Sequence, residues 1–288
     1  QNNTRKVMCA TIGEKTIGDI FSNVDKLKGE KEVDVIIGGP PCQAYSVAGR
    51  ARMGKDVEKD PRNELYKYYV RFLERYNPRM FVFENVLGIL TAKKGEPFAD
   101  LKRLVEELGY NMDCKVQIAS EHGVLQDRHR VIIVGWKDDE FKSYSYPILE
   151  KESMPYAVMK DLFADLPLRK AGEGSLCEIV SYIKPLSEMN YLKESGIRGV
   201  LSFTTQHVAR PTNANDRQIY KIAVDLWLKN KQRLNYAKLP IQLQTHNNKK
   251  SFLNRFNVVN PFGCCHTVVA HIAMDGHYYI YPTPNPTL

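Results

Sequence analysis

The residues best suited to do chemistry are one cysteine, one glutamate and two arginines, which lie in three separate motifs. Cys42 stands behind two prolines in GGPPCQAYS, directly after the apolar run VDVII. Glu84 opens ENV at the end of a second apolar run, and Arg128 and Arg130 alternate in QDRHR before a third. Cysteines are more often structural than reactive, so Cys42 alone indicates little. Together, a thiol, a carboxyl group and two guanidinium groups are suited to attack on a polarised, electron-poor ring.

The elements that must position these residues alternate between strand and helix along the first half of the chain. Apolar runs predict strands at 5–12, 33–39, 78–86, 111–119 and 128–136, and amphipathic patterns predict helices at 61–77 and 97–110. This alternation predicts a doubly wound α/β sheet, which binds its ligands at the carboxyl ends of its strands. Cys42, Glu84 and the loop at 120–128 all lie at or beside predicted strand ends.

The second half of the chain has a different texture. After Trp136 the alternation stops, polar loops lengthen, and Asn, His, Lys and Arg become frequent. A helix is predicted at 215–230, and HTVVAHIA at 266–273 has the pattern of a strand. The change predicts a second, smaller α+β domain rich in loops. The boundary falls near 140–155, and we divide the chain into 1–145 and 146–288.

Composition limits the classes of protein and partner. The 288 residues carry a net charge of +8, which favours a polyanionic partner, and the six cysteines form no CxxC pair, which fits a reducing cytoplasm. No run of 18 apolar residues predicts a membrane span, and no signal peptide is recognisable. Cys264, Cys265 and His266, with His271 and His277 nearby, match no common metal-site spacing, so no metal is expected.

At this point the motifs can be compared with a known family. GGPPCQAYS, ENV and QDRHR, in this order and at these spacings, resemble the motifs of the DNA cytosine-5 methyltransferases. IGDI at 17–20 is similar to the family's adenine-binding motif, and DPRNELYKYYV at 60–70 to the motif that opens the next helix. The stretch at 265–282 resembles the end of the target-recognition region. The resemblance implies a Rossmann-like methyltransferase sheet in 1–145, a recognition domain in 146–288, and a bacterial, cytoplasmic restriction–modification role.

Two parts of the family pattern are not recognisable. The glycine-rich turn that holds the methionine part of S-adenosylmethionine does not precede residue 17, and the family's closing motifs would begin where YPTPNPTL ends. The resemblance leaves open whether the remaining segments are provided in cis, by a second chain or not at all. Without them, residues 1–288 are expected to bind the cofactor negligibly.

The resemblance implies a role for each residue of the three motifs. The Cys42 thiolate would add to C6 of a cytosine flipped out of the duplex, while Glu84, in its protonated form, donates to N3. C5 would then take the methyl group of S-adenosylmethionine, which leaves S-adenosylhomocysteine. Arg130 would hold the cytosine O2, and Arg128 would help to fix the loop and the backbone.

The resemblance also implies binding residues for the cofactor and for DNA. Asp19 suits the adenine amino group, and Ile20, Pro41 and Leu65 would line the apolar wall of that pocket, although all three apolar residues could equally belong to the core. The basic segment after Cys42 could be a solvated loop or a lid that closes over DNA. The residues expected to contact DNA are Gln43, Ser46, Arg50, Arg52, Gln126, Arg210, Arg255 and Thr267.

Two other functions remain open at this stage. A tRNA cytosine-5 methyltransferase could share the catalytic motifs, but it lacks a large recognition domain and carries a Cys-Phe-Thr signature that this sequence does not contain. A non-catalytic DNA-binding remnant, or one part of a split enzyme, could retain the same motifs. A cofactor-binding titration would distinguish the remnant from an enzyme.

Overall fold

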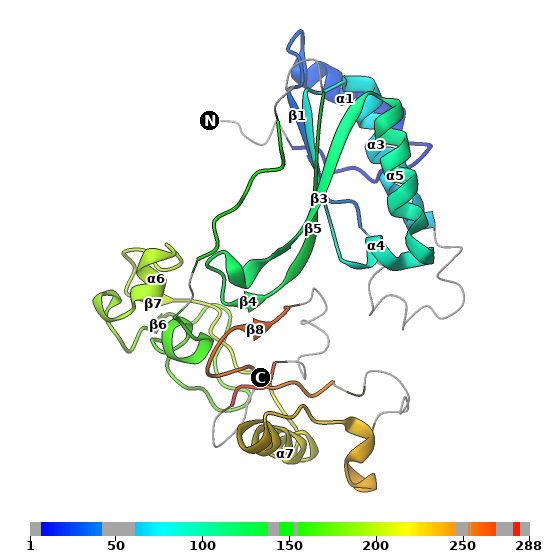
Figure 1. Ribbon diagram of the computed structural model, residues 1–288. Coiled ribbons are helices and arrows are strands. Elements are labelled where there is room, and N and C mark those ends of the chain that lie inside the picture. The colour runs from blue at the N-terminus through cyan, green and yellow to red at the C-terminus, as the bar shows by residue number, and fades with distance from the viewer. Residues whose placement is uncertain are drawn as a thin grey trace. The chain divides into compact units, whose positions relative to one another are not determined.

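The computed structural model describes residues 7–41, 61–137, 144–152, 155–245, 253, 255–268 and 279–282. The chain divides into two compact units (Figure 1). Unit 1 comprises Gln1–Gln117 and His129–Leu149, and unit 2 comprises Ile118–Arg128 and Glu150–Leu288. The segment 118–128, which carries most of QDRHR, thus belongs to the second unit although it lies within the sequence of the first.

In its described residues, unit 1 is built on a mixed, four-stranded sheet in the order β1–β2–β5–β3. β1 and β2 run parallel, with Gly38 opposite Phe83, whereas β2 and β5 run antiparallel, with Glu84 opposite Ile132. The strands are β1 (Val35–Gly38), β2 (Met80–Asn85), β3 (Tyr110–Ile118) and β5 (His129–Lys137). All four lie within or next to predicted strands, so the α/β class is confirmed; the double winding stays a prediction.

The strand predicted at 5–12 is wrong for its described part. Residues 7–12 form neither helix nor strand, and the side chains of Val7 and Ile12 are 78% and 43% exposed. A strand is stable only when a neighbouring strand accepts and donates its backbone hydrogen bonds. The described residues offer none to this segment, so its apolar pattern has no sheet to join.

Helices cover one face of the sheet and create the core of unit 1 (Figure 1). They are α1 (Ile17–Lys28), α3 (Leu65–Tyr76), α4 (Gly88–Thr91) and α5 (Glu96–Glu107). Leu73 of α3, Phe83 of β2 and Leu101 of α5 are fully buried in this core. The helices predicted at 61–77 and 97–110 are confirmed as α3 and α5. On the opposite face of β1, Val35 and Ile37 are exposed, because none of the described residues covers them.

Apart from one helix of 17 residues, the described elements of unit 2 are short and are joined by irregular segments. It has two pairs of two-residue strands: β4 (Gln126–Asp127) is parallel to β8 (Cys265–His266), and β6 (Val180–Ser181) is antiparallel to β7 (Phe203–Thr204). Its α-helices are α6 (Asn190–Glu194) and α7 (Ala214–Asn230), and α7 confirms the helix predicted at 215–230. Of the strand predicted at 266–273, only His266 lies in β8; 267–268 follow it and the rest lies outside the described residues.

Short helical turns complete the connections in both units. They are 3₁₀ turns at Pro61–Glu64, Ala92–Gly95, Ala119–Glu121, Leu186–Glu188, Tyr236–Lys238 and Ile241–Leu243, and one π-helical turn at Val158–Leu162. None of the helices that the structure describes is long and apolar enough to cross a membrane.

Two kinds of contact hold unit 2 together. An apolar cluster surrounds α7, where Tyr220, Tyr236 and Phe256 are almost fully buried. A second centre is a buried ion pair, in which the Arg198 Nη1 lies 2.8 Å from Asp165 Oδ2 and the two side chains are 7% and 2% exposed. The unit therefore relies on an internal charge pair as well as on apolar packing.

Candidate active site

The carboxyl ends of β1 and β2 lie side by side because these strands pair in parallel. Gly39, directly after β1, lies so close to β2 that an added Cβ would be 3.1 Å from Glu84 Oε2. A side chain at this position would therefore press on the carboxyl group. The absence of a Cβ at Gly39 lets the backbone that leads to Cys42 approach Glu84. Cys42 itself lies outside the described residues.

Asn85 ties the same two strand ends together. Its side chain is only 2% exposed, and its Nδ2 donates to the backbone oxygen of Pro40 over 3.4 Å. Its Oδ1 accepts from the backbone N–H of Val86 at 2.8 Å. Asn85 thus connects the proline segment before Cys42 with the turn after β2. The residue lies inside ENV, but nothing in the motif itself indicates this connecting role.

Tyr69 of α3 fixes β1 and β2 from the helical side. Its hydroxyl lies 3.0 Å from the backbone oxygens of both Ile36 and Val82, one on each strand. Burial raises the pKa of Tyr69 well above its usual range, so the hydroxyl remains a donor. Its ring occupies the space beside Gly38, where an added Cβ would lie 2.6 Å from the ring carbon Cε2. The sequence indicated Tyr69 only as a core residue of a helix.

Glu84 and Arg130 form a direct ion pair across β2 and β5. The Arg130 Nε lies 2.6 Å from Glu84 Oε1, and the two side chains are 22% and 43% exposed. Glu84 pairs with Ile132, and side chains two residues apart share a face, so Arg130 projects from the same face as Glu84. A second nitrogen of the guanidinium, Nη1, donates to the backbone oxygen of His129 at 2.8 Å. The structure thus brings together the predicted acid and one predicted cation.

Three other predicted site residues join the same two segments of unit 2 through hydrogen bonds to backbone groups. Gln126 Oε1 accepts from the backbone N–H of Val268 at 3.2 Å, and Arg128 Nη1 donates to the backbone oxygen of Val268, also at 3.2 Å. Thr267 Oγ1 donates to the backbone oxygen of Asp127 at 2.7 Å. We call this arrangement of residues 126–128 and 267–268 the clasp. No local sequence pattern indicates the clasp, because its partners are 140 to 142 residues apart.

The remaining predicted DNA contacts differ in exposure. Arg210 is half-buried, and its backbone oxygen accepts from Gly172 N at 3.2 Å. Arg255 is only 6% exposed, and its guanidinium lies 4.3 Å from the ring centre of Tyr236. Burial over an aromatic ring favours a packing role for Arg255, which the sequence did not indicate. Gln43, Ser46, Arg50 and Arg52 lie outside the described residues.

The predicted adenine-binding residues lie on three elements of unit 1. Asp19 is exposed in the first turn of α1, while Ile20 beside it is only 7% exposed and belongs to the core. Pro41 is exposed after β1, and Leu65 is half-buried at the start of α3. Asp19 and Pro41 are therefore available to a ligand, whereas Ile20 contributes chiefly to packing.

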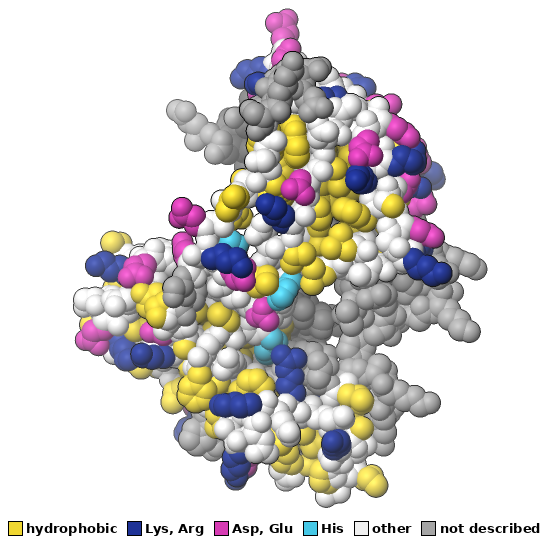
Figure 2. Space-filling view, viewed as in Figure 1, with side chains coloured by type: hydrophobic (Ala, Val, Ile, Leu, Met, Phe, Trp, Pro, Cys, Tyr) yellow, Lys and Arg dark blue, Asp and Glu magenta, His cyan; other side chains and the backbone are white. Residues whose placement is uncertain are grey.

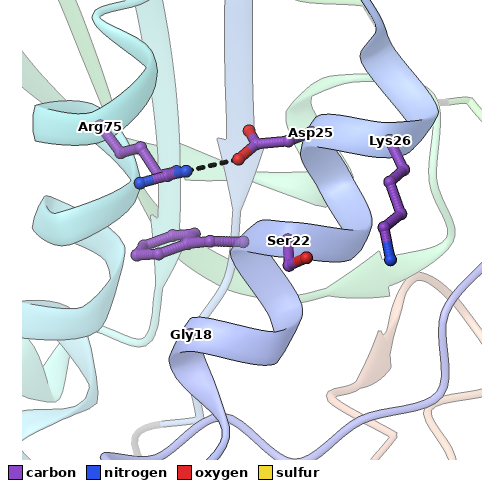
Figure 3. Close-up of a pocket in the computed structure, with 6 residues that line it drawn as sticks. Gly18, Ser22, Asp25, Lys26 and Arg75 are labelled. Atoms are coloured by element: carbon purple, nitrogen blue, oxygen red, sulfur yellow. Dashed lines mark hydrogen bonds and ion pairs between the residues drawn. The ribbon is translucent and has the colours of Figure 1, made fainter.

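A separate surface depression of about 530 Å³ lies between α1 and α3 (Figure 3). Arg75 and Asp25 point toward each other across it and form an ion pair, which lowers the pKa of the exposed Asp25 carboxyl. Phe21 forms its apolar side, with the Arg75 guanidinium 4.9 Å from the ring centre. Neither Asp19 nor Ile20 lines this depression, so it is distinct from the predicted adenine site.

The surface charge of the described residues is mixed. Figure 2 shows Lys and Arg side chains interspersed with Asp and Glu over the visible face. No group of three or more His, Cys, Asp or Glu residues suited to a metal ion occurs in the part of the chain that the structure describes.

The arrangement of these strand ends agrees with the match to a family. The sequence model of the C-5 cytosine-specific DNA methylases matches residues 2–259, and the chain belongs to this family. It is 39% identical over 266 residues to the type II methyltransferase M.Bpa9945I of Bacillus paralicheniformis, a match that covers 87% of this chain and 58% of that protein. It is 37% identical over 172 residues to M1.HphI of Haemophilus parahaemolyticus, which covers 58% of this chain and 45% of that protein.

The solved structures give the fold. A crystal structure described as a DNA modification methyltransferase encoded within an E. coli prophage superposes with a TM-score of 0.57 at 20% identity. The match covers 96% of this chain and 70% of that chain. The chain spans about half the length of the curated relatives it matches. The family match thus shows the family of the chain, and the superposition shows its fold. The activity of the whole protein is a separate question.

Proposed function

We propose that the protein containing this chain methylates C5 of cytosine in a specific sequence of duplex DNA, as part of a restriction–modification system. One observation carries the proposal: the Glu84–Arg130 ion pair lies against the backbone that leads to Cys42. A nucleophile, an acid and a cation at adjoining strand ends match the requirements of attack on a cytosine ring. The family and its type II relatives support the same chemistry.

Each residue has a defined task in the proposed reaction. The Cys42 thiolate adds to C6 of the flipped-out base, while Glu84 gives a proton to N3 and so accepts the charge that the ring gains. Arg130 lies beside Glu84 and would donate to the cytosine O2. C5 becomes nucleophilic, gains the methyl group and loses its proton. Elimination of Cys42 then restores the aromatic ring.

S-adenosylmethionine supplies an electrophilic methyl group when it is bound. The donor set of this chain suits its adenine portion, because the exposed Asp19 carboxylate can accept from an amino group and the exposed Pro41 offers an apolar surface. Leu65, half-buried at the start of α3, adds to that surface. We assign the adenine portion to these residues, with Ile20 as packing beneath them.

Duplex DNA is the partner that the proposal requires, and the net charge of +8 fits a polyanion. A protein that methylates bacterial DNA acts in the cytoplasm. A second chain that carries the remaining cofactor motifs is compatible with the reaction, but the reaction does not depend on it.

A covalent trap tests the proposal. Duplex DNA with 5-fluorocytosine at the target base should form a stable adduct with the full-length protein, since fluorine cannot leave C5 as a proton does. The adduct, seen as a shifted band under denaturing conditions, should disappear in Cys42→Ala and persist in Cys177→Ala, whose cysteine is exposed in unit 2. An adduct that survives Cys42→Ala removes Cys42 from its role, and trapping on tRNA in place of DNA supports the alternative substrate.

A further inference from the structure

The clasp adjoins a very short parallel sheet, which β4 and β8 form. Gln126 pairs with Cys265 and Asp127 with His266, and the Cys265 N–H donates to the backbone oxygen of Leu125 at 3.0 Å. Two residue pairs provide few backbone hydrogen bonds. A strand of this length therefore needs further contacts to keep its register.

Side chains continue the hydrogen bonding beyond the end of this sheet. The Arg128 N–H turns back to the oxygen of Gln126 at 2.9 Å, and the Arg128 oxygen accepts from Ala119 N at 2.9 Å. The backbone N–H and oxygen of Arg128 therefore already have hydrogen-bond partners other than Val268. Instead, the side chains of Gln126 and Arg128 bond the N–H and the oxygen of Val268, both at 3.2 Å. The side chains of Gln126 and Arg128 thus continue the hydrogen bonding of the β4–β8 pair to Val268, where the backbone of residues 126–128 makes no bond.

Tyr279 makes a second set of contacts with the same segment. The Tyr279 hydroxyl donates to the backbone oxygen of Thr267 at 3.2 Å. The Tyr279 ring stacks on His266, with ring centres 5.1 Å apart and planes within 8°. His266 and Thr267 therefore contact Tyr279 as well as residues 126–128, and these contacts restrain the backbone of the segment.

We propose that Gln126 is a positioning residue that fixes the backbone at Val268 for sequence recognition and does not itself contact DNA. The proposal rests on the proposed function and deepens it. Its basis is that the Gln126 Oε1 is used within the protein, on the segment that resembles the end of the recognition region. A recognition segment held in place before DNA arrives avoids the entropy cost of becoming ordered during binding. Discrimination between sites then depends on a residue that touches no base.

Two substitutions at Gln126 distinguish positioning from DNA contact, because the two roles predict opposite orders of harm for the two variants. Gln126→Glu keeps an oxygen that accepts from the Val268 N–H, and the neighbouring Arg128 guanidinium offsets the added charge. Gln126→Met has a similar shape but no acceptor of comparable strength. If Gln126 positions Val268, Glu is tolerated and Met is harmful. If Gln126 contacts DNA, Glu is worse than Met, because a carboxylate repels the phosphate backbone.

The measurement is discrimination by the full-length protein. The recognised sequence is first mapped by bisulfite sequencing of methylated DNA, and kcat/KM is then compared on that site and on a site with one base pair changed. The ratio of kcat/KM on the recognised site to kcat/KM on the changed site should fall about three- to tenfold in Gln126→Met. This is the effect of one lost hydrogen bond. Gln126→Glu should keep the ratio within about twofold.

Hydrogen exchange on the protein without DNA provides an independent readout. The Val268 amide should exchange slowly in the wild type and in Gln126→Glu, and faster in Gln126→Met. A Glu variant that binds DNA less well than the Met variant overturns the proposal, as does an unchanged ratio in both. If the wild type shows no DNA methylation, the proposed function fails first, and the positioning role in recognition falls with it. In that case the exchange data still establish whether the clasp forms.

Discussion

The two units are stabilised in different ways. In unit 1, strands of four to nine residues form one sheet and three twelve-residue helices help to cover one face, so that Phe83 and Leu101 are fully buried. In unit 2, the four named strands have two residues each, and side chains such as Gln126 and Arg128 take the place of longer ladders. Asp165 and Arg198 add a charge pair inside the fold. Regular packing thus carries the proposed chemistry, and individual polar contacts carry the proposed recognition.

This difference has a consequence for what a mutation should do. A strand end supported by a sheet can carry a reactive group in a fixed position, as Gly39 and Asn85 show beside Glu84. A loop supported by single hydrogen bonds can change its residues with local effects only. The units should therefore respond differently to substitution, in rate for unit 1 and in stability or selectivity for unit 2.

The largest effect is expected at Glu84 in unit 1. Glu84→Gln keeps the shape of the side chain but removes the acid, so methyl transfer should slow by about 10²–10⁴-fold, the usual contribution of general acid catalysis. Single-turnover transfer of a labelled methyl group to DNA measures this rate. DNA affinity should change less than about threefold.

Arg79→Gln is a matched control for Glu84→Gln. Arg79 is an exposed residue of the same unit, 3.9 Å from Asp34 in a surface ion pair of small energetic value. Its rate should remain within about twofold of the wild type. A Glu84→Gln protein that also stays within threefold would end the acid role and blur the distinction between the units.

The next effect concerns stability in unit 2. Asp165→Leu leaves the Arg198 guanidinium buried without its counterion, which should lower the free energy of unfolding by about 3–5 kcal/mol. The double variant Asp165→Leu/Arg198→Met removes both charges and should recover most of this loss. Labelling with 5-fluorotryptophan follows each unit in urea, since Trp136 lies in β5 and Trp227 in α7. Loss of the Trp136 signal together with Trp227 would show that the units unfold as one.

The smallest effect is a pH dependence that originates beside the clasp. Burial raises the pKa of the Cys265 thiol from 9.0 to about 11, so the folded state favours the neutral thiol. The associated stability is present below pH 9 and is lost as the pH rises toward 11, by on the order of 2 kcal/mol. Cys265→Ala should flatten this part of the unfolding profile, whereas Cys177→Ala, at an exposed site, should not. Parallel profiles for all three proteins would contradict the assignment.

Much of unit 1 could be predicted because its residues follow simple periods. Tyr66, Tyr69, Val70 and Leu73 recur at helical spacing, and all four are buried on one face of α3. The apolar run at 33–39 did not indicate that only one face of β1 would be covered by other described residues. On the other face, Ile37 is 76% exposed. Periodicity reports which residues can be buried, but the neighbours that bury them are set elsewhere in the chain.

The site was predictable in its residue types but only partly in its contacts. Glu84 and Arg130 were expected to converge, because strand ends meet at one edge of a sheet, and they do. Arg255 was expected on the surface as a DNA contact, yet it lies buried over Tyr236. An arginine has a long apolar stem and a flat cation, so its sequence position does not reveal whether it faces water or an aromatic ring.

The clasp also determines the order in which the protein can mature on the ribosome. Its partners are separated by 140 to 142 residues, whereas β5, which joins the sheet of unit 1, begins at His129, directly after the first of them. Closing a chain segment of this length costs about 4 kcal/mol in the length-dependent entropy alone. At ordinary rates of synthesis, on the order of ten seconds pass between the emergence of Gln126 and of Val268. During that time the nascent chain can form its sheet, but the segment 126–128 has no recognition segment to hold.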